Sequence, residues 1–215
     1  MADVEQKYVP LHLHTEYSLL DGAIRIGELL SFCKENNFPA VAITDHGVMY
    51  GDMELYELAR DSGVKPLMGC EFYVHNGDIT EHDKTNNPCY HLVLIAKNNI
   101  GYQNIIKLTS IAWCKGRYVK PRINWELLEQ YHEGLICCSA CLGGEVLQSL
   151  LKNDYESAKA IAQKYKDLFG EDYYIELQDH GMEEQKRTNP ELIRLAKELD
   201  IEMVITNDSH YLRLE

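Results

Sequence analysis

Residues 8–22 read YVPLHLHTEYSLLDG and place two histidines one residue apart on a short apolar run. Side chains two residues apart on a β-strand point to the same side, so His12 and His14 are expected to share one face while Leu13 lies on the other. A His-x-His pair supplies two imidazole nitrogens to one metal ion. Two histidines on a solvated edge strand are the alternative explanation, and this stretch alone does not decide between them.

The bulk composition limits what the chain can be. Its 215 residues, 45% of them hydrophobic, are enough for one large domain or two small ones. A net charge of −13 repels phosphate, so tight unaided binding to nucleic acid is not expected. The first ten residues lack the apolar core of a signal peptide, and no apolar run is long enough to cross a membrane. Seven cysteines, several in the apolar segment LICCSAC, suggest reduced thiols in the cytoplasm.

Strand-like apolar runs alternate with amphipathic helical patterns along the chain. The strand-like runs cover residues 9–14, 40–44, 66–74, 90–96, 135–140, 173–178 and 203–206, and helical spacing marks residues 26–37, 51–63, 156–170 and 189–200. Buried strands that alternate with helices predict a parallel sheet covered by helices. Because no linker or repeat interrupts the pattern, one α/β domain built as a closed β/α barrel is expected. An open doubly wound sheet is the alternative, although no glycine-rich phosphate loop follows the first run.

Side chains of the kinds that bind metals occur where these runs end. In a β/α barrel the chemistry lies at the C-terminal ends of the strands. The candidates there are His12 and His14 in the first run, Asp21 in the loop after it, Asp45 and His46 after the second run, Cys141 after the fifth, and Asp208 and His210 after the last. Two further candidates lie elsewhere: Glu71 is in the middle of the third run, and His91 is near the beginning of the fourth.

Most of these residues also have an ordinary structural explanation when taken singly. Asp21 fits a turn, Asp45 fits a helix cap, and Cys141 fits a small apolar core residue. A buried carboxylate such as that of Glu71 needs a partner. So many donors at one barrel mouth favour a metal site, and the mixture of imidazole, carboxylate and thiolate suits zinc or a similar transition metal rather than calcium.

Two other motifs give weaker signals. Cys138 and Cys141 form a Cys-x-x-Cys pair, but an offset of three on a strand points the two side chains to opposite faces, and no second pair exists. A redox role is therefore not expected. The stretch YVKPRI carries Lys120 and Arg122, and in so acidic a chain we interpret these two cations as part of a solvated loop.

Eight segments together resemble a known family. They read HLHTEYSLLDG, AITDHGVMYG, GCEFYV, YHLVLIAKNNIGYQNIIKL, KPRI, GLICCSACLGGEV, IELQDHG and TNDSHYL, and they cover essentially the whole chain in order. In this order they resemble the N-terminal PHP (polymerase and histidinol phosphatase) domains of bacterial replicative DNA polymerase III alpha subunits. The segments GYQNIIKL and KPRI favour this polymerase branch over stand-alone PHP phosphatases.

The resemblance implies a distorted seven-stranded β/α barrel with a trinuclear metal centre. It implies nine ligands, carried over as His12, His14, Asp21, His46, Glu71, His91, Cys141, Asp208 and His210. One metal would lie among His12, His14, Glu71 and Asp208, a second among Glu71, His91 and Cys141, and a third among Asp21, His46 and His210. Two to three divalent transition metals, whether zinc, manganese or iron, are therefore expected. Asp45, next to His46, is expected to orient a ligand imidazole from outside the ligand set.

The activity implied is hydrolysis of phosphodiesters at a DNA 3′ end, as in a proofreading 3′-5′ exonuclease. The implied partners are DNA, bound weakly by this chain alone, together with the remaining polymerase domains and other replicase subunits, with no membrane. Two alternatives remain open: a non-catalytic module that supports the polymerase, and a small-molecule phosphoesterase of the histidinol-phosphatase type. Residues 1–215 would form one domain, excised from the N-terminus of a longer chain that supplies the polymerase activity.

Overall fold

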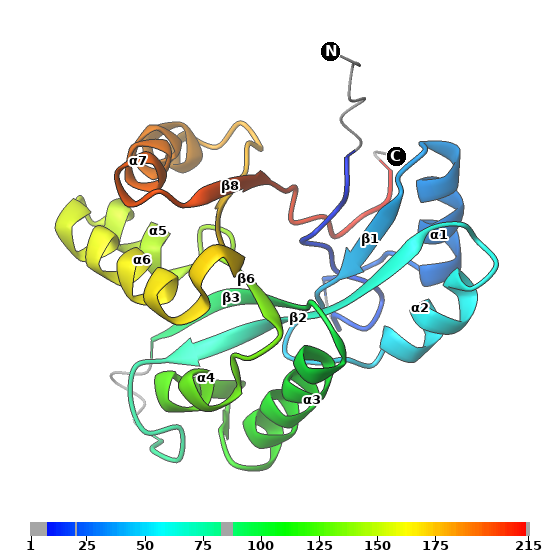
Figure 1. Ribbon diagram of the computed structural model, residues 1–215, viewed down its shortest axis with the longest axis horizontal. Coiled ribbons are helices and arrows are strands. Elements are labelled where there is room, and N and C mark those ends of the chain that lie inside the picture. Colours follow the sequence, from blue (N-terminus) through cyan, green and yellow to red (C-terminus); the bar gives the residue numbers. More distant parts are fainter. Residues whose placement is uncertain (1–7, 20, 83–87, 214–215) are drawn as a thin grey trace.

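The strands curl around a common centre and the helices lie outside them (Figure 1). The computed structural model describes residues 8–19, 21–82 and 88–213. Its strands are β1 (Ala40–Ile43), β2 (Lys65–His75), β3 (Cys89–Ala96), β4 (Arg117–Tyr118), β5 (Lys120–Asn124), β6 (Leu135–Cys138), β7 (Tyr173–Leu177) and β8 (Glu202–Ile205). They form one mixed sheet in the order β4-β5-β2-β3-β6-β7-β8, with β1 paired to the first half of β2. The α/β class and the curled, barrel-like sheet agree with the sequence analysis.

The helices pack in two groups against the outer face of this sheet (Figure 1). They are α1 (Ile26–Glu35), α2 (Asp52–Ala59), α3 (Asn99–Cys114), α4 (Trp125–Tyr131), α5 (Glu145–Leu151), α6 (Tyr155–Phe169) and α7 (Glu183–Leu199), with a short 3-10 turn, η1 (Gly170–Asp172). In α1 the buried residues Ile26, Leu29 and Cys33 recur at helical spacing and pack on β1. Burial of an isoleucine or leucine side chain of this kind contributes about 1.5–3 kcal/mol to folding.

The first strand-like run, residues 9–14, does not form a regular strand. Its backbone instead bridges two neighbours, because Thr44 N donates to Leu13 O at 2.9 Å and His14 N donates to Ser209 O at 2.8 Å. The run therefore joins β1 to the segment that follows β8 and closes the ring between them. Leu13 packs with the α1 and α2 side chains, on the side away from His12 and His14, as the alternation predicts.

The expectation of an all-parallel sheet is wrong for β3. This strand runs antiparallel to both β2 and β6, whereas the β1–β2, β2–β5, β6–β7 and β7–β8 pairs are parallel. No helix separates β2 from β3 in the described residues, and antiparallel neighbours need no crossover helix. The reversal places His91, near the beginning of β3, opposite Tyr73 near the end of β2. His91 therefore lies at the same end of the sheet as the C-terminal ends of the parallel strands.

The interpretation of the YVKPRI stretch as a solvated loop is also wrong. Residues 117–124 form the β4–β5 hairpin, and β5 pairs in parallel with the last residues of β2. Arg122 is completely buried. Its guanidinium donates to the carbonyl oxygens of Gly116 at 3.0 Å, Ile79 at 2.6 Å and Glu81 at 2.9 Å. A charged side chain becomes tolerable in the interior when backbone carbonyls replace its water in this way.

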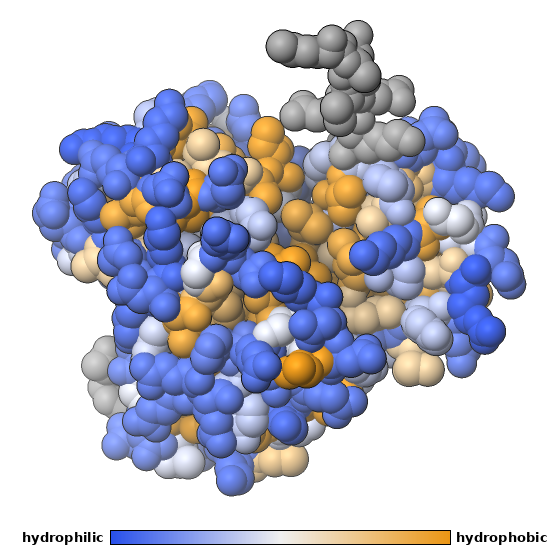
Figure 2. Space-filling model, viewed as in Figure 1, coloured by the Kyte–Doolittle hydropathy of each residue, from blue (hydrophilic) through white to orange (hydrophobic). Residues whose placement is uncertain are grey.

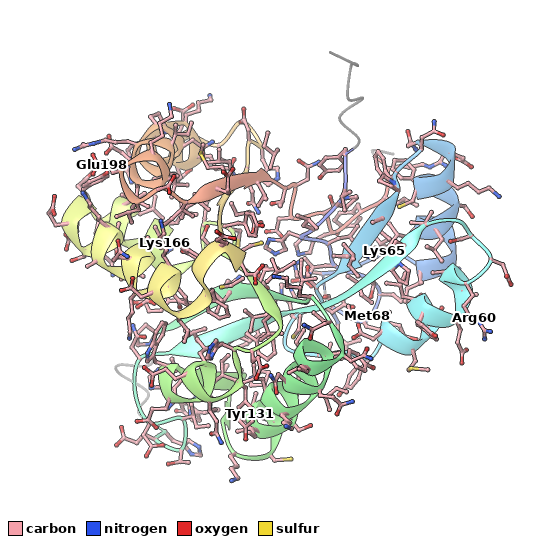
Figure 3. The ribbon with its side chains drawn as sticks, viewed as in Figure 1. Arg60, Lys65, Met68, Tyr131, Lys166 and Glu198 are labelled. Carbon is pink, nitrogen blue, oxygen red and sulfur yellow. The ribbon has the colours of Figure 1, made fainter. Side chains whose placement is uncertain are left out.

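A pocket of about 940 Å³ opens at the end of the sheet where the parallel strands begin. Its walls are mainly apolar and include Leu11, Met68, Ile95, Ile136 and Val204. Figure 2 shows apolar side chains gathered in the hollow at the centre of its view. Lys65 and Met68, labelled in Figure 3, mark where β2 begins at this opening.

Candidate metal centre

Glu71 is the centre of a polar cluster at the opposite end of the sheet. Its side chain is fully buried in the middle of β2, next to the end of β1. Oε1 of Glu71 lies 3.2 Å from Nε2 of His12 and 2.7 Å from Nδ1 of His91. Oε2 lies 2.5 Å from Nδ1 of His46. One carboxylate thus faces imidazoles from three separate segments.

A second carboxylate, Asp208, faces the two histidines of the first segment. Oδ1 of Asp208 lies 3.3 Å from Nε2 of His12 and 3.1 Å from Nε2 of His14. Oδ1 of Asp208 and Nε2 of His14 are buried, yet neither makes a hydrogen bond within the described part of the chain. Two buried polar atoms that face each other without bonding geometry fit a cation held between them. On this test the donor set suits a metal ion.

The described residues contain three groups in which all the donor atoms lie within 4.8 Å of one another. They are His12, His14 and Glu71; Glu71, His91 and Cys141; and His14, His46 and His210. The first group contains three of the four residues that the resemblance implies for one metal and lacks Asp208, and the second group contains the three residues implied for another. The third group differs from the implied set, because it contains His14 in place of Asp21. The centroid of the His14 ring lies 4.0 Å from that of His46 and 4.3 Å from that of His210. Asp21 approaches only His46 in this set, with Oδ2 3.3 Å from Nε2.

Cys141 reaches the cluster from the turn after β6. Its Sγ lies 3.5 Å from Nδ1 of His91 and 4.0 Å from Oε1 of Glu71. Burial and the neighbouring carboxylates of Glu71 and Asp208 raise the pKa of this thiol. A metal cation would act in the opposite direction and favour the thiolate. The turn fits closely against the histidine ring, since a Cβ at Gly143 would lie 2.9 Å from Cγ of His91.

The cluster shifts the pKa values of its own members. Burial alone would raise the pKa of Glu71, but the three facing imidazoles hold it well below its usual value. Burial opposes protonation of His12, yet the carboxylates of Glu176 and Glu71 raise the pKa of this imidazole. The pKa of His14 falls because the ring is buried. Two opposing effects therefore set these pKa values: facing groups of opposite charge outweigh burial at Glu71 and His12, and burial prevails at His14.

Among the described residues, the ring of His46 bonds to Glu71 and Asp21 and not to Asp45, its neighbour in sequence. Asp45 accepts hydrogen bonds from the amide of Thr15 at 2.7 Å and from Oγ of Ser18 at 2.6 Å. Oγ of Ser18 lies 3.0 Å from Nδ1 of His14. Ser18 therefore links the carboxylate of Asp45 to the imidazole of His14, which makes His14 the ligand imidazole that Asp45 is placed to orient.

The sequence analysis missed Glu176. This buried side chain lies on β7, and its Oε1 is 2.6 Å from Nδ1 of His12. Gln178 Nε2 donates to the same oxygen at 2.9 Å, and the hydroxyl of Thr206 also donates to it. The signal was present in the sequence, since Glu176 and Gln178 are two residues apart and face inward together from an otherwise apolar strand.

Comparison with known proteins supports the family assignment. The family model for the PHP domain matches residues 10–180. DNA polymerase III subunit alpha of Campylobacter jejuni is 46% identical over 215 residues, which cover 95% of this chain, and that of Deinococcus radiodurans is 45% identical over 97% of it. The chain spans only 18% and 16% of the length of these two relatives.

Solved structures show the same fold at low sequence identity. A protein from Bifidobacterium adolescentis described as a metal-dependent phosphoesterase matches with a TM-score of 0.50 and 13% identity, over 95% of this chain and 88% of its own. An amidohydrolase from Chromobacterium violaceum matches with a TM-score of 0.53 and 16% identity, over 94% and 87% of the two chains. The family model and the convergence of the predicted donors lead to one conclusion: the chain belongs to the PHP domain family.

Proposed function

We propose that this chain is the PHP domain of a cytoplasmic bacterial replicative polymerase of the DNA polymerase III alpha type, and that it hydrolyses phosphodiesters at DNA 3′ ends as a proofreading exonuclease. One observation carries the proposal: donors from six segments far apart in sequence converge around Glu71, and Glu71 belongs to two of the three donor groups. A structural module would not need so many charged and polar groups in a buried place, where each unpaired group costs free energy.

The proposed ligands hold two to three divalent transition metals, whether zinc, manganese or iron. Such ions, when bound, lower the pKa of water and neutralise charge on a phosphodiester. Glu71 is proposed to bridge two of the ions, His91 and Cys141 to complete one site, and Asp21, His46 and His210 to serve another. The mixture of thiolate, imidazole and carboxylate suits transition metals better than calcium or magnesium.

Neighbouring residues would fix the orientation of the two histidines on the first segment. Because Nδ1 of His12 lies 2.6 Å from a Glu176 oxygen, that nitrogen holds the ring proton and leaves the lone pair of Nε2 directed toward Asp208 and Glu71. Ser18, held by Asp45, occupies the corresponding place at Nδ1 of His14. Both rings then present Nε2 to the proposed metal sites.

The other parts of the proposal concern the longer protein. The relatives are several times longer than this chain, so polymerisation and contacts with other replicase subunits would belong to that context. Within the described residues, no helix is both long and apolar enough to cross a membrane.

Activity measurements on the 215-residue chain test the exonuclease. After reconstitution with zinc, manganese or iron, the chain should shorten a 5′-labelled single-stranded oligonucleotide from its 3′ end, and EDTA should abolish the activity. Glu71→Ala should be inactive, whereas Glu57→Ala, which changes an exposed acid on α2, should keep full activity.

The two alternatives give different results in the same experiment. A chain that binds less than one metal ion and cleaves nothing would indicate the structural module. A chain that cleaves an aminoalkyl phosphate much faster than DNA would indicate a small-molecule phosphoesterase.

A further inference from the structure

One segment of this acidic chain is free of acidic residues. Residues 84–125 contain seven of the 21 lysines and arginines and none of the 34 aspartates and glutamates. The net charge of −13 therefore conceals a strongly basic stretch. In the structure this stretch includes β3, α3, the β4–β5 hairpin and the turns between them.

The hairpin end of this segment lies directly beside the metal centre. Trp113, in the last turn of α3, donates its indole N–H to the carbonyl of Gly47 at 2.8 Å, and Gly47 follows His46. Lys120 donates to the hydroxyl of Tyr73 at 3.2 Å. The ring of Tyr73 in turn lies edge-to-face with the His91 ring, with centroids 5.2 Å apart. The hairpin end of the segment thus contacts Gly47, which follows the predicted ligand His46, and Tyr73, whose ring contacts that of the predicted ligand His91.

We name Trp113, Lys115, Arg117 and Lys120 the hairpin patch. All four side chains are exposed. Arg117 lies over the ring of Trp113, with its guanidinium carbon 5.6 Å from the ring centroid. In the described part of the chain none of the three cations forms an ion pair with a carboxylate, whereas Lys97 of the same segment pairs with Asp172 at 2.7 Å. The patch therefore has charge that no acidic side chain of the described residues neutralises by direct contact.

We propose that the hairpin patch binds the backbone of a single-stranded nucleic acid and directs its 3′ end toward the metal centre, an inference that rests on the proposed exonuclease function. Exposed aromatic rings stack on bases and neighbouring cations bind phosphates, which is the usual arrangement in surfaces that hold single strands. Three phosphate contacts give a logarithmic salt dependence with a slope of about −2. The overall negative charge keeps the affinity low, in agreement with the weak DNA binding expected from the sequence. The hairpin patch specifies which residues would contact the strand.

A charge-reversal experiment on the 215-residue chain tests the patch. Anisotropy of a fluorescein-labelled oligothymidylate measures binding to wild type, to Arg117→Glu/Lys120→Glu and to the control Lys34→Glu/Lys152→Glu, whose two lysines are exposed and distant in sequence from the segment. Both double variants lower the net charge by four. The hairpin variant should bind at least tenfold more weakly than the control. Equal weakening in the two variants would mean that only net charge matters and would overturn the proposal.

Fluorescence of Trp113 gives a second test that needs no change in the patch. The chain has two tryptophans, so Trp125→Phe leaves Trp113 as the only indole. Adding oligothymidylate should quench its emission with the same midpoint as the anisotropy change, and unchanged emission at saturating oligonucleotide would contradict the proposed stacking. Glu71→Ala separates this inference from the proposed function, since it should lose nuclease activity but keep the quenching. If the wild-type chain shows quenching but no nuclease activity, the proposed exonuclease function is contradicted and the proposed role of the hairpin patch in binding is not.

Discussion

The two ends of the curled sheet are built from the same strands but differ in chemistry. At one end β2 contributes Glu71 and β7 contributes Glu176, both buried and both surrounded by polar partners. At the other end the same two strands contribute Met68 and Tyr174 to a largely apolar pocket. A few residues along each strand separate a cluster of metal-type donors from a wall of apolar side chains.

The difference shows where the fold tolerates buried charge. At the metal end the carboxylates of Glu71, Glu176 and Asp45 each have an oxygen that faces an imidazole or a hydroxyl, so these local contacts offset part of the cost of burial. At the apolar end Asp52, in the first turn of α2, has no hydrogen-bond partner for either carboxylate oxygen within the described residues. The two ends therefore predict opposite responses to the removal of a buried acid.

The largest effect is expected at the shared carboxylate of the metal end. Glu71→Ala should remove the metal ions of two sites, whereas Cys141→Ala should affect only one, because Glu71 belongs to two donor groups and Cys141 to one. Elemental analysis after reconstitution should find more than one ion per wild-type chain. Cys138→Ala is the matched control and should keep its metal, since Cys138 packs in the apolar interior with Val93 and Ala140. Equal metal loss in the Glu71 and Cys141 variants would contradict the bridging role.

A smaller effect is expected from the residue that the sequence analysis missed. Glu176→Gln keeps the size of the side chain but removes the charge that faces Nδ1 of His12 at 2.6 Å. Loss of such a partner weakens metal binding by about 10- to 100-fold. Competition with a fluorescent chelator measures the change, with Glu57→Gln on the exposed face of α2 as the control. An unchanged affinity would mean that Glu176 serves packing alone.

The smallest effect is expected at the apolar end, where removal of the buried acid should be favourable and increase stability. Burial, with a contribution from the charge of Asp45, raises the pKa of Asp52 from 3.8 to about 8. Between these two pKa values the folded chain holds the proton of Asp52 while the unfolded chain loses it. The contribution of the protonated carboxyl to stability is therefore complete below about pH 4 and is lost as the pH rises through about 8. Asp52→Asn should be more stable than wild type by about 1–3 kcal/mol at pH 8, with a smaller gain at pH 5.

Thermal unfolding at the two pH values measures this difference. Asp61→Asn, at an exposed position shortly after α2, controls for the loss of one negative charge. If Asp52→Asn lowers stability at pH 8, the carboxylate has a stabilising partner and the contrast between the two ends is weaker than the structure indicates.

The sequence predicted the convergence of the donor-type side chains better than the path of the backbone that carries them. The positions of six strands followed from apolar runs, because such runs depend only on local pattern. The direction of β3 did not follow from the apolar runs, since strand direction depends on the connection after β2. This error left unexplained why His91 lies near the beginning of its run and not at the end. Residues 9–14 had the alternation of a strand but make only isolated bridges, because their neighbours are short and lie at the closure of the ring.

Residues whose partners come from distant parts of the sequence were the hardest to predict. Glu176 and Ser18 are common residue types on ordinary elements, and their importance appears only when His12 and His14 are placed beside them. Arg122 was misinterpreted for the same reason. Its carbonyl acceptors belong to residues near 80 and to Gly116, and no local pattern brings these segments together.

The closure of the ring has a consequence for biosynthesis. His12 and His14 leave the ribosome well before Asp208 and Ser209, the residues that contact them. Contacts between such distant parts of a sequence form late in folding, because the intervening chain must first be ordered. A nascent chain arrested before residue 206 would display the histidines without Asp208 and His210, which fall in the closing segment. Uptake of the full proposed set of metal ions would therefore have to follow the synthesis and docking of residues 206–210.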